Sequence, residues 1–369
     1  MEKARHELKN QLLKTLGDRL NEIKIANQTL GKNSNPFIVG EVGINHNGEI
    51  SKAFEMIEIA KKVGLSAIKF QTFKASEFCG NSSEKYTYQS QGKKITEPMI
   101  DMFSRCEFSK DEWIKIYEKC KSEKIHFMST PQNYSDLELL LELGIDSIKV
   151  GSDDLTNLPL LKKFSKTNLP IILSSGMSNL EEVSDALETI GFHDNYPTIL
   201  LVTTSQYPTP PEDVNLLKFQ TFSKHFPDLL LGFSDHTIDN TASSIACGFG
   251  SIFFEKHFTL DRDLPGPDHW FSINPSELNT WKTSILNSYK MLGNQKIQPT
   301  KIEETMKVIA RRSIVILKDI DKNEIFTNDN LGLRRPGNGI SPKQMDKIIG
   351  KHSTKKILKG QLLQEDDYR

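Results

Sequence analysis

This sequence of 369 residues has little that would mark a secreted, membrane-bound or nucleic-acid-binding protein. Its cysteines, Cys79, Cys106, Cys120 and Cys247, have neither metal-binding nor redox-type spacing, so we expect reduced, partly buried thiols. No run reaches the roughly 20 apolar residues of a membrane span, and the N-terminus has no apolar core of signal-peptide length. The 47 lysines and arginines balance 48 aspartates and glutamates, so no global field favours nucleic acid or an acidic membrane. We therefore expect a cytoplasmic protein that binds neither nucleic acid nor membranes.

What the sequence does contain is a series of short apolar segments rich in β-branched residues. They are 37–42, 66–70, 125–128, 147–150, 170–173, 198–202, 229–233 and 251–254. The intervening segments have a helical pattern; residues 51–63, for example, begin with a serine that can cap the helix. Strands that alternate with helices pair in parallel through right-handed crossovers. Eight such units predict an α/β fold, a (β/α)8 TIM barrel of about 250 residues.

Residues 1–35 precede the first predicted strand. Leucines recur there at every fourth position, which places them on one face of an amphipathic helix. These are Leu8, Leu12, Leu16 and Leu20. We predict an N-terminal helical extension that packs on the barrel or on a partner subunit.

Other parts of the chain also depart from the alternation of strands and helices. The segment 73–108 is long, polar and irregular, which is typical of a lid or an oligomer contact. The predicted barrel domain covers 36–291, and a polar linker follows at 292–311. Short strands and tight turns then predict a small β-rich domain over 312–369, which is too small to hold a deep pocket by itself.

Polar and charged side chains gather just past the ends of the predicted strands. In a TIM barrel the active site lies at the C-terminal mouth of the strands, so these side chains would share one cavity. They include Glu41, Lys69, Gln71, Thr130, Lys149, Ser152, Asp154, Ser174, Ser205, Tyr207, Ser234, Asp235, His236, Glu255 and His257. This placement indicates an enzyme.

Two lysines, Lys69 and Lys149, end the second and fourth predicted strands. An ammonium group at the rim of an apolar strand loses hydration unless an anion meets it. Together with the serines at the same mouth, the lysines predict a site for a small polyanion that bears phosphate or carboxylate. Alternatively, each lysine pairs with a carboxylate of the barrel.

Two histidines, His236 and His257, end the seventh and eighth predicted strands. These strands are neighbours in a barrel, so both imidazoles can reach one divalent cation and leave positions open for substrate or water. The alternative is that each is a hydrogen-bonded structural residue.

Carboxyl, amide and phenol groups complete the predicted site. Glu41 can orient a water molecule or transfer a proton, or it can form an ion pair with one of the lysines. Gln71, Asp154, Tyr207 and Asp268 supply donors and acceptors suited to a polyhydroxylated substrate, although any one of them could instead cap a turn.

At these positions the chain resembles the sialic acid synthase family, the phosphoenolpyruvate-dependent nonulosonate synthases. The resemblance extends in order from about residue 37 to the C-terminus and is carried by specific motifs. These are 40–48 (GEVGINHNG), 69–71 (KFQ), 149–152 (KVGS), 174–177 (SSGM), 207–210 (YPTP), 232–237 (GFSDHT), 255–259 (EKHFT), 266–268 (GPD) and 334–339 (RRPGNG). The last motif resembles the antifreeze-like (SAF, β-clip) domain of that family.

The resemblance implies that phosphoenolpyruvate condenses with the open-chain aldehyde of an N-acylated mannosamine-type sugar, giving a nine-carbon 2-keto acid and phosphate. It implies that phosphoenolpyruvate binds to Lys69, Lys149, Thr130, Ser152, Ser174, Ser205 and Ser234. It also implies a divalent metal, Mn or Mg, on His236 and His257. Sugar contacts would come from Gln71, Asp154, Tyr207 and Asp268. Arg335 would enter the site of the other subunit of a domain-swapped homodimer.

The chemistry is consistent with these implied roles. C3 of phosphoenolpyruvate is a weak nucleophile, so the aldehyde needs a Lewis acid on its oxygen, which a metal held by the histidines supplies. We expect Glu41 to position the water that attacks C2, or to stabilise the cation formed there. The lysines would neutralise the departing phosphate.

Two departures from the family pattern concern the acceptor sugar. Family members carry Glu or Asp at position 154, and here the shorter Asp154 leaves room for a bulkier sugar; His269 stands where some members have an apolar residue. Besides N-acetylneuraminate, the product could therefore be legionaminate or pseudaminate, made from a 2,4-diacetamido sugar. A lyase lacks support, because no lysine has the apolar setting of a Schiff-base former. If the chain were a catalytically silent sugar- or ice-binding protein, we would expect the polar residues at the barrel mouth to be replaced. Glu41, Lys69, His236 and His257 are all present.

Overall fold

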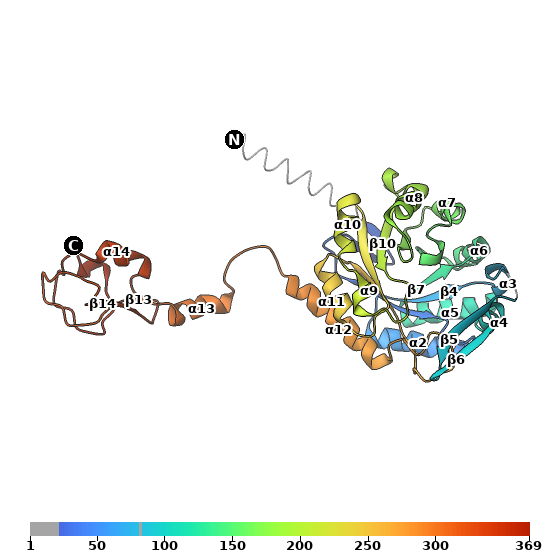
Figure 1. Ribbon diagram of the computed structural model, residues 1–369, viewed down its shortest axis with the longest axis horizontal. Coiled ribbons are helices and arrows are strands. Elements are labelled where there is room, and N and C mark those ends of the chain that lie inside the picture. The colour runs from blue at the N-terminus through green and yellow to red at the C-terminus, as the bar shows by residue number, and fades with distance from the viewer. Residues whose placement is uncertain (1–21, 81–82) are drawn as a thin grey trace. The chain divides into compact units, whose positions relative to one another are not determined.

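The computed structural model describes residues 22–80 and 83–369, and the chain divides into two compact units after Gly293 (Figure 1). The helix predicted from Leu8 to Leu20 lies outside the described residues. No helix among the described residues is long and apolar enough to cross a membrane.

The first unit is built around one sheet of eight parallel strands. They are β3 (Phe37–Gly43), β4 (Ala67–Thr72), β7 (His126–Pro131), β8 (Ile148–Val150), β9 (Ile171–Ser174), β10 (Thr198–Thr203), β11 (Leu230–Asp235) and β12 (Phe253–His257). Hydrogen bonding gives the order β7-β4-β3-β12-β11-β10-β9-β8, and the end strands β7 and β8 also contact each other. The sheet therefore curls into the predicted TIM-like barrel.

Helices surround the strands, as Figure 1 shows. They are α2 (Ile50–Val63), α5 (Lys110–Glu123), α6 (Tyr134–Leu143), α7 (Leu158–Ser165), α8 (Leu180–Ile190), α9 (Pro211–Val214), α10 (Lys218–His225), α11 (Thr241–Gly248) and α12 (Pro275–Leu292). Capping boxes at Ser109, Asn179 and Asn274 begin three of them. The predicted cap at Ser51 is wrong, because α2 begins at Ile50 after a turn that puts Glu49 at the cap position.

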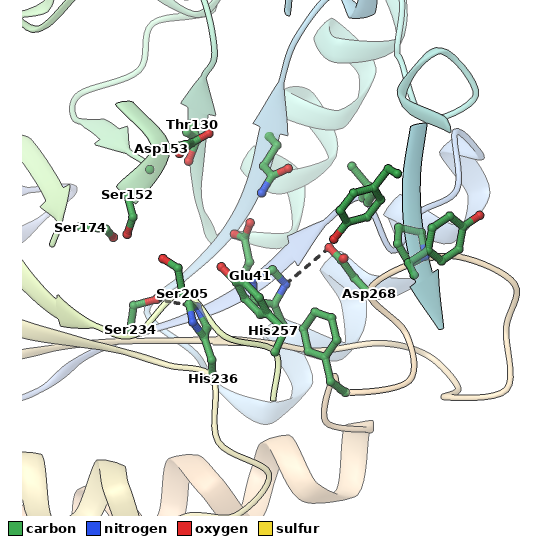
Figure 2. A pocket seen from close by; sticks show the side chains of 18 of the residues that line it. Glu41, Thr130, Ser152, Asp153, Ser174, Ser205, Ser234, His236, His257 and Asp268 are labelled. Carbon is green, nitrogen blue, oxygen red and sulfur yellow. Dashed lines mark hydrogen bonds and ion pairs between the residues drawn. The ribbon is translucent and has the colours of Figure 1, made fainter. Parts of the chain in front are cut away.

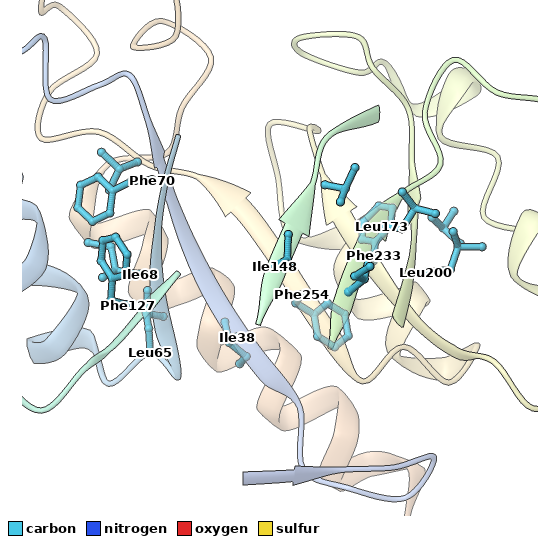
Figure 3. Close-up of a cluster of buried hydrophobic side chains, with 14 of the residues drawn as sticks. Ile38, Leu65, Ile68, Phe70, Phe127, Ile148, Leu173, Leu200, Phe233 and Phe254 are labelled. Atoms are coloured by element: carbon cyan, nitrogen blue, oxygen red, sulfur yellow. The ribbon is translucent and has the colours of Figure 1, made fainter. Parts of the chain in front are cut away.

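The main core fills the layer between strands and helices. Ile38, Phe70, Phe127, Leu173 and Phe254 are among its members (Figure 3). Parallel strands are buried on both faces, which explains why they have continuous apolar sequences.

A hairpin of β1 (Ile23–Ile25) and β2 (Gln28–Leu30) precedes the barrel, where the sequence predicts part of a helical extension. Apolar residues alternate with Lys24 at the period of a strand, so Ile23 and Ile25 share one buried face. They pack with residues near the beginnings of the barrel strands, and the backbone amide of Ala26 donates to Asp146 (2.7 Å) just before β8. The hairpin thus closes the end of the barrel opposite the mouth.

The segment 73–108 is more regular than its polar sequence predicts. It contains α3 (Ala75–Phe78), a hairpin of β5 (Lys85–Ser90) and β6 (Lys93–Pro98), and α4 (Met99–Ser104). At the hairpin tip the Gln91 side chain donates to the carbonyl of Asp263 (2.8 Å), and Ser90 accepts from the amide of Gly266 (3.0 Å). These bonds tie the hairpin to the loop after β12, at the mouth of the barrel.

The second unit, Asn294–Arg369, is small and built mainly from short strands and turns. It contains α13 (Lys301–Ala310), β13 (Ser313–Ile316), β14 (Leu331–Arg334) and α14 (Met345–Ile348). Helix α13 occupies part of the segment predicted as a linker, because Thr300 and Glu303 form a capping box. Ile314, Ile316, Phe326 and Leu331 belong to a separate apolar core.

Candidate active site

A cavity of about 910 Å³ lies at the C-terminal mouth of the barrel. Side chains from all eight strands or the loops after them line it (Figure 2). The sequence-predicted residues among them are Glu41, Lys69, Gln71, Thr130, Lys149, Ser152, Ser174, Ser205, Tyr207, Ser234, His236, Glu255, His257 and Asp268. Asp154 and Asp235, which the sequence also places at the mouth, are not among the lining residues.

Two ammonium groups and two carboxyl groups meet at the base of the cavity. Lys69 Nζ lies 2.9 Å from Glu41 Oε2 and 3.5 Å from Glu255 Oε2. Lys149 Nζ lies 3.9 Å from Glu255 Oε1 and donates to Ser174 Oγ (2.7 Å). All four side chains are at most 5% exposed. Glu255 therefore links the two lysines into one buried cluster.

Within this cluster, burial disfavours the charged form of each group, whereas the opposite charges nearby favour it. Burial raises the pKa of Glu41 to about 7 despite Lys69, and burial lowers the pKa of Lys149 to about 8. Burial alone would raise the pKa of Glu255, but Lys149 and Lys69 outweigh it and bring that pKa to about 2. Glu255 is thus the permanent anion. Glu41 can take up or release a proton near neutral pH.

Hydroxyl groups beside Lys149 form the part of the cavity suited to an anion. The amide of Gly176 donates to Ser152 Oγ (3.0 Å). A Cβ placed on Gly176 would lie only 2.2 Å from Ser205 Oγ and 2.7 Å from Ser152 Oγ. The absence of a side chain at 176 therefore lets both hydroxyls approach the backbone at this point.

We expect Gly176→Ala to weaken binding of an anionic substrate about tenfold or more, since the methyl group displaces Ser152 and Ser205. Calorimetric titration with phosphoenolpyruvate measures this loss. Gly248→Ala is the matched control, because a Cβ at Gly248 meets nothing within 4 Å. Equal affinities in the two variants would contradict the assigned role of the hydroxyls.

The imidazoles of His236 and His257 face the same side of the cavity, with ring centroids 5.7 Å apart (Figure 2). His236 Nδ1 lies 2.7 Å from the carbonyl of Thr204, which must accept a hydrogen bond, so Nδ1 carries the proton and Nε2 keeps its lone pair. Burial lowers the pKa of His236 to about 4 and that of His257 well below its ordinary value. Both rings are therefore neutral and can act as ligands.

The donor set fits a two-histidine metal site with open positions. His257 Nδ1 is buried and has no hydrogen-bond partner among the described residues; it lies 3.9 Å from Asp268 Oδ2. Within residues 22–80 and 83–369 no three or more His, Cys, Asp or Glu side chains gather as a metal site. Any cation held here would need substrate or water to complete its coordination.

Two other predicted sugar contacts, Tyr207 and Asp268, lie beside the histidines. Tyr207 packs on the His236 ring, with centroids 4.2 Å apart, and burial raises the pKa of Asp268 to about 7. Asp153, not Asp154, lines the cavity. Asp154 instead accepts a hydrogen bond from Asn157 (2.9 Å). Ser152–Asp154 is a 3₁₀ turn, in which successive side chains point about 120° apart, so Ser152 and Asp153 can both reach the cavity while Asp154 is left outside it.

The segment 73–108, which contains the β5–β6 hairpin and is called the β5–β6 insertion below, supplies an apolar wall of the cavity that the sequence analysis did not predict. Ile44 and residues of the insertion line this end of the cavity, among them Phe78, Tyr86, Met99, Met102 and Phe103. Tyr88 donates to Glu97 (2.6 Å), which also pairs with Arg105 (2.6 Å), so the hairpin is braced. The tyrosines at positions 86 and 88 were the available signal, since they alternate at the period of a strand.

Arg335 lies in the second unit, directly after β14, and its side chain is exposed. Its predicted entry into the site of another subunit stays a prediction.

A parallel barrel whose mouth joins paired lysines, carboxyl groups and neutral histidines defines an enzyme that acts on small anionic molecules. Residues 56–297 match the NeuB family, and residues 311–369 match the SAF domain. The chain is 35% identical over 337 residues to the N,N'-diacetyllegionaminic acid synthase of Legionella pneumophila, covering 90% of this chain and 94% of that protein. It is 38% identical over 331 residues to the enzyme of the same name from Campylobacter jejuni, covering 89% and 98%.

Solved structures agree. The N-acetylneuraminic acid synthetase of Leptospira borgpetersenii, in complex with citrate, matches with a TM-score of 0.69 and 31% identity, covering 77% of this chain and 94% of that one. The chain therefore belongs to the NeuB family and carries a C-terminal SAF domain. The family and the enzyme class predicted from the sequence, a sugar acid synthase, are confirmed.

Proposed function

We propose that this enzyme condenses phosphoenolpyruvate with the open-chain aldehyde of an N-acylated mannosamine-type sugar, releasing phosphate and a nine-carbon 2-keto sugar acid. The observation that carries the proposal is the convergence of the lysine pair and the histidine pair on one cavity of about 910 Å³. We also propose that it works in the cytoplasm.

Phosphoenolpyruvate would bind at the lysine end. Its phosphate would meet Lys149, Ser174 and the hydroxyls around Gly176, which already form a set of donors around one position. Its carboxylate would lie near Lys69, whose Nζ donates to Thr130 Oγ1 (3.2 Å). This arrangement directs C3 toward the histidine end, where the aldehyde of the sugar would lie.

His236 and His257 would hold a divalent cation, Mn or Mg, together with open positions for the sugar. When bound, such a cation supplies Lewis acidity to a carbonyl oxygen. The residues present fit this role because both imidazoles are neutral and His257 has an unpartnered buried nitrogen.

Side chains of the protein would then position the attacking water and transfer its proton. Attack of C3 on the aldehyde carbon forms the C–C bond and breaks the carbonyl π bond, so the sugar oxygen takes the electron pair and a proton, and positive charge is left at C2. Glu41 Oε1 is buried without a hydrogen-bond partner among the described residues, so it can hold the water that adds to C2 and take its proton. The C2–O bond to phosphate then breaks as the new C2 hydroxyl loses its proton and becomes the keto group, and Lys149 and Lys69 neutralise the leaving group.

The alkaline side of the pH profile should report Lys149. Its pKa is about 8 in the free enzyme, so the ammonium is charged below that pH and is lost above it. We expect kcat/KM for phosphoenolpyruvate to fall above about pH 8. Lys149→Arg keeps its charge, so the alkaline fall should disappear although activity is lower. An unchanged alkaline limb in Lys149→Arg would assign it to another group.

The apolar wall favours a more specific acceptor, a 2,4-diacylamino sugar with a deoxygenated C6. Phe78, Met99 and Phe103 can contact acyl methyl groups, whereas they offer no partner to the extra hydroxyls of N-acetylmannosamine. The names of the Legionella and Campylobacter relatives point to the same class of product.

Arg335 would reach the sugar from the second subunit of a domain-swapped homodimer. We expect Arg335→Ala to raise KM for the sugar about tenfold while KM for phosphoenolpyruvate changes little. Mixing this variant with His257→Ala should restore part of the activity, because a mixed dimer keeps one intact site. A mixture that, at low sugar concentration, is never more active than Arg335→Ala alone would contradict the swap.

The test of the function is a phosphate-release assay with phosphoenolpyruvate and a panel of acceptors. The panel contains N-acetylmannosamine, its 6-phosphate, 2,4-diacetamido-2,4,6-trideoxymannose and N-acetylglucosamine, with His257→Ala as the blank. We expect release with at least one mannose-type acceptor and the highest kcat/KM with the diacetamido sugar. No release with any member of the panel would overturn the proposal.

A further inference from the structure

Behind the two histidines lies a buried ion pair that has no role in the scheme above. Asp235 and Lys256 are register partners on the neighbouring strands β11 and β12. Lys256 Nζ lies 3.1 Å from Asp235 Oδ2, and the side chains are 2% and 0% exposed. Side chains alternate along a strand, so this pair points away from the cavity that His236 and His257 face.

The pair fixes the turn that follows His236. Asp235 Oδ1 accepts from the amide of Thr237 (2.9 Å) and from its hydroxyl (2.7 Å). Lys256 Nζ donates to the carbonyls of Thr237 (2.5 Å) and Asp239 (3.2 Å). The residues immediately before and after His236 are thus tied to each other and to the residue immediately before His257.

The same pair is anchored to the helices outside the barrel. Asp235 Oδ2 accepts from Ser243 Oγ (2.6 Å) on α11. Ser243 Oγ in turn accepts from the indole N–H of Trp281 (2.8 Å) on α12. Trp281 is fully buried, so this hydrogen-bonded chain joins both strand ends to the rigid core.

We infer that Asp235 and Lys256 are positioning residues that set the placement of His236 relative to His257, and thereby the affinity for a divalent cation. The inference rests on the proposed function, in which both histidines bind that cation. A metal site with only two protein ligands depends strongly on their geometry, because no third ligand compensates for a misplaced ring. Substitution of residues that orient metal ligands typically lowers affinity about 10–100-fold.

The experiment is Mn²⁺ titration of the chelator-treated full-length protein, with free Mn²⁺ measured by electron paramagnetic resonance. We expect Asp235→Asn and Lys256→Met each to weaken Mn²⁺ binding at least about tenfold. Lys256→Arg keeps the charge and the donors, so it should recover most of the affinity. Metal-free binding of phosphoenolpyruvate should change less than about threefold, because Lys149 and Ser174 lie outside this network.

The matched control is Asp146→Asn. It changes a partly exposed aspartate that lies 3.0 Å from His126, before the beginning of β8 and away from the mouth. It should cost stability but leave Mn²⁺ affinity unchanged. If Asp235→Asn fails to fold, Ser243→Ala takes its place, since it removes one hydrogen bond to Asp235 and should weaken Mn²⁺ in the same direction by a smaller factor.

The outcomes separate the inference from the function on which it rests. If His257→Ala binds Mn²⁺ as the parent does, the metal assignment fails whatever the ion pair does. If His257→Ala abolishes binding but the variants of Asp235, Lys256 and Ser243 bind as tightly as Asp146→Asn, the pair has only a structural role and the inference is overturned.

Discussion

Replacing His257 with alanine is expected to lower turnover at least about 1,000-fold, while the protein stays folded. A bound cation contributes several kcal/mol to stabilising charge on a carbonyl oxygen, and each 1.4 kcal/mol is about tenfold in rate. One imidazole cannot hold the cation in the required place, so most of this contribution should be lost. The loss should appear mainly in kcat, with phosphoenolpyruvate still bound at the lysine end.

The control for this substitution is His225→Ala. His225 ends α10 on the surface, and within the described part of the chain its ring interacts only with the carbonyl of Thr221 (2.8 Å) and the neighbouring Phe226 ring. Its removal should leave turnover within about twofold of the parent. Full activity in His257→Ala at saturating Mn²⁺ would remove the histidine pair from the mechanism.

Lys69→Met should have the second large effect, because it removes activity and stability together. Lys69 is 3% exposed and is paired with two buried carboxyl groups, Glu41 and Glu255. Removing one partner of a buried ion pair typically costs about 3–5 kcal/mol, since the other charge is left uncompensated. Turnover should fall at least about 1,000-fold, because the carboxylate of phosphoenolpyruvate loses its cation.

A double variant distinguishes these two effects. Adding Glu41→Gln to Lys69→Met removes one of the stranded acids, so denaturant unfolding should show part of the lost stability recovered. Activity should not return, because neither the cation nor the water-positioning carboxylate is restored. If Lys69→Met is as stable as the parent, water or protonation of the carboxylates compensates for the missing ammonium group, and the expected loss of stability is contradicted.

Much of the fold could be predicted because barrel strands are buried on both faces. β10 (Thr198–Thr203), for example, coincides with an apolar run that few other structures would produce. The candidate site followed from the same rule, since residues after parallel strands must meet at one mouth. Lys69 and His257, almost two hundred residues apart, therefore line one cavity.

Features that depend on short or mixed patterns were not predicted. The strands β1 and β2 have three residues each, too few for a periodicity to stand out. The β5–β6 hairpin is polar along most of its length because one face meets solvent. The apolar residues of segment 73–108 that line the cavity lie mainly in α3 and α4, which flank the hairpin.

The pairing of charges inside the site could not be predicted from the sequence either. Glu255 stands at a strand end in the sequence, but only the register of β12 between β3 and β11 places it between Lys69 and Lys149. Likewise, nothing in the sequence distinguishes Asp153 from Asp154. Their directions are set by the 3₁₀ turn, which local sequence specifies weakly.

The sharpest single measurement uses phosphoenolpyruvate labelled with ¹⁸O in the oxygen that bridges C2 and phosphorus. In the proposed reaction C3 is the nucleophile, water adds to C2, and two ammonium groups surround the leaving phosphate. This reaction cleaves the bond between C2 and the bridging oxygen, so mass spectrometry should find the label in the released phosphate. Label retained in the sugar acid, which only P–O cleavage can produce, would contradict the assignment of this cavity.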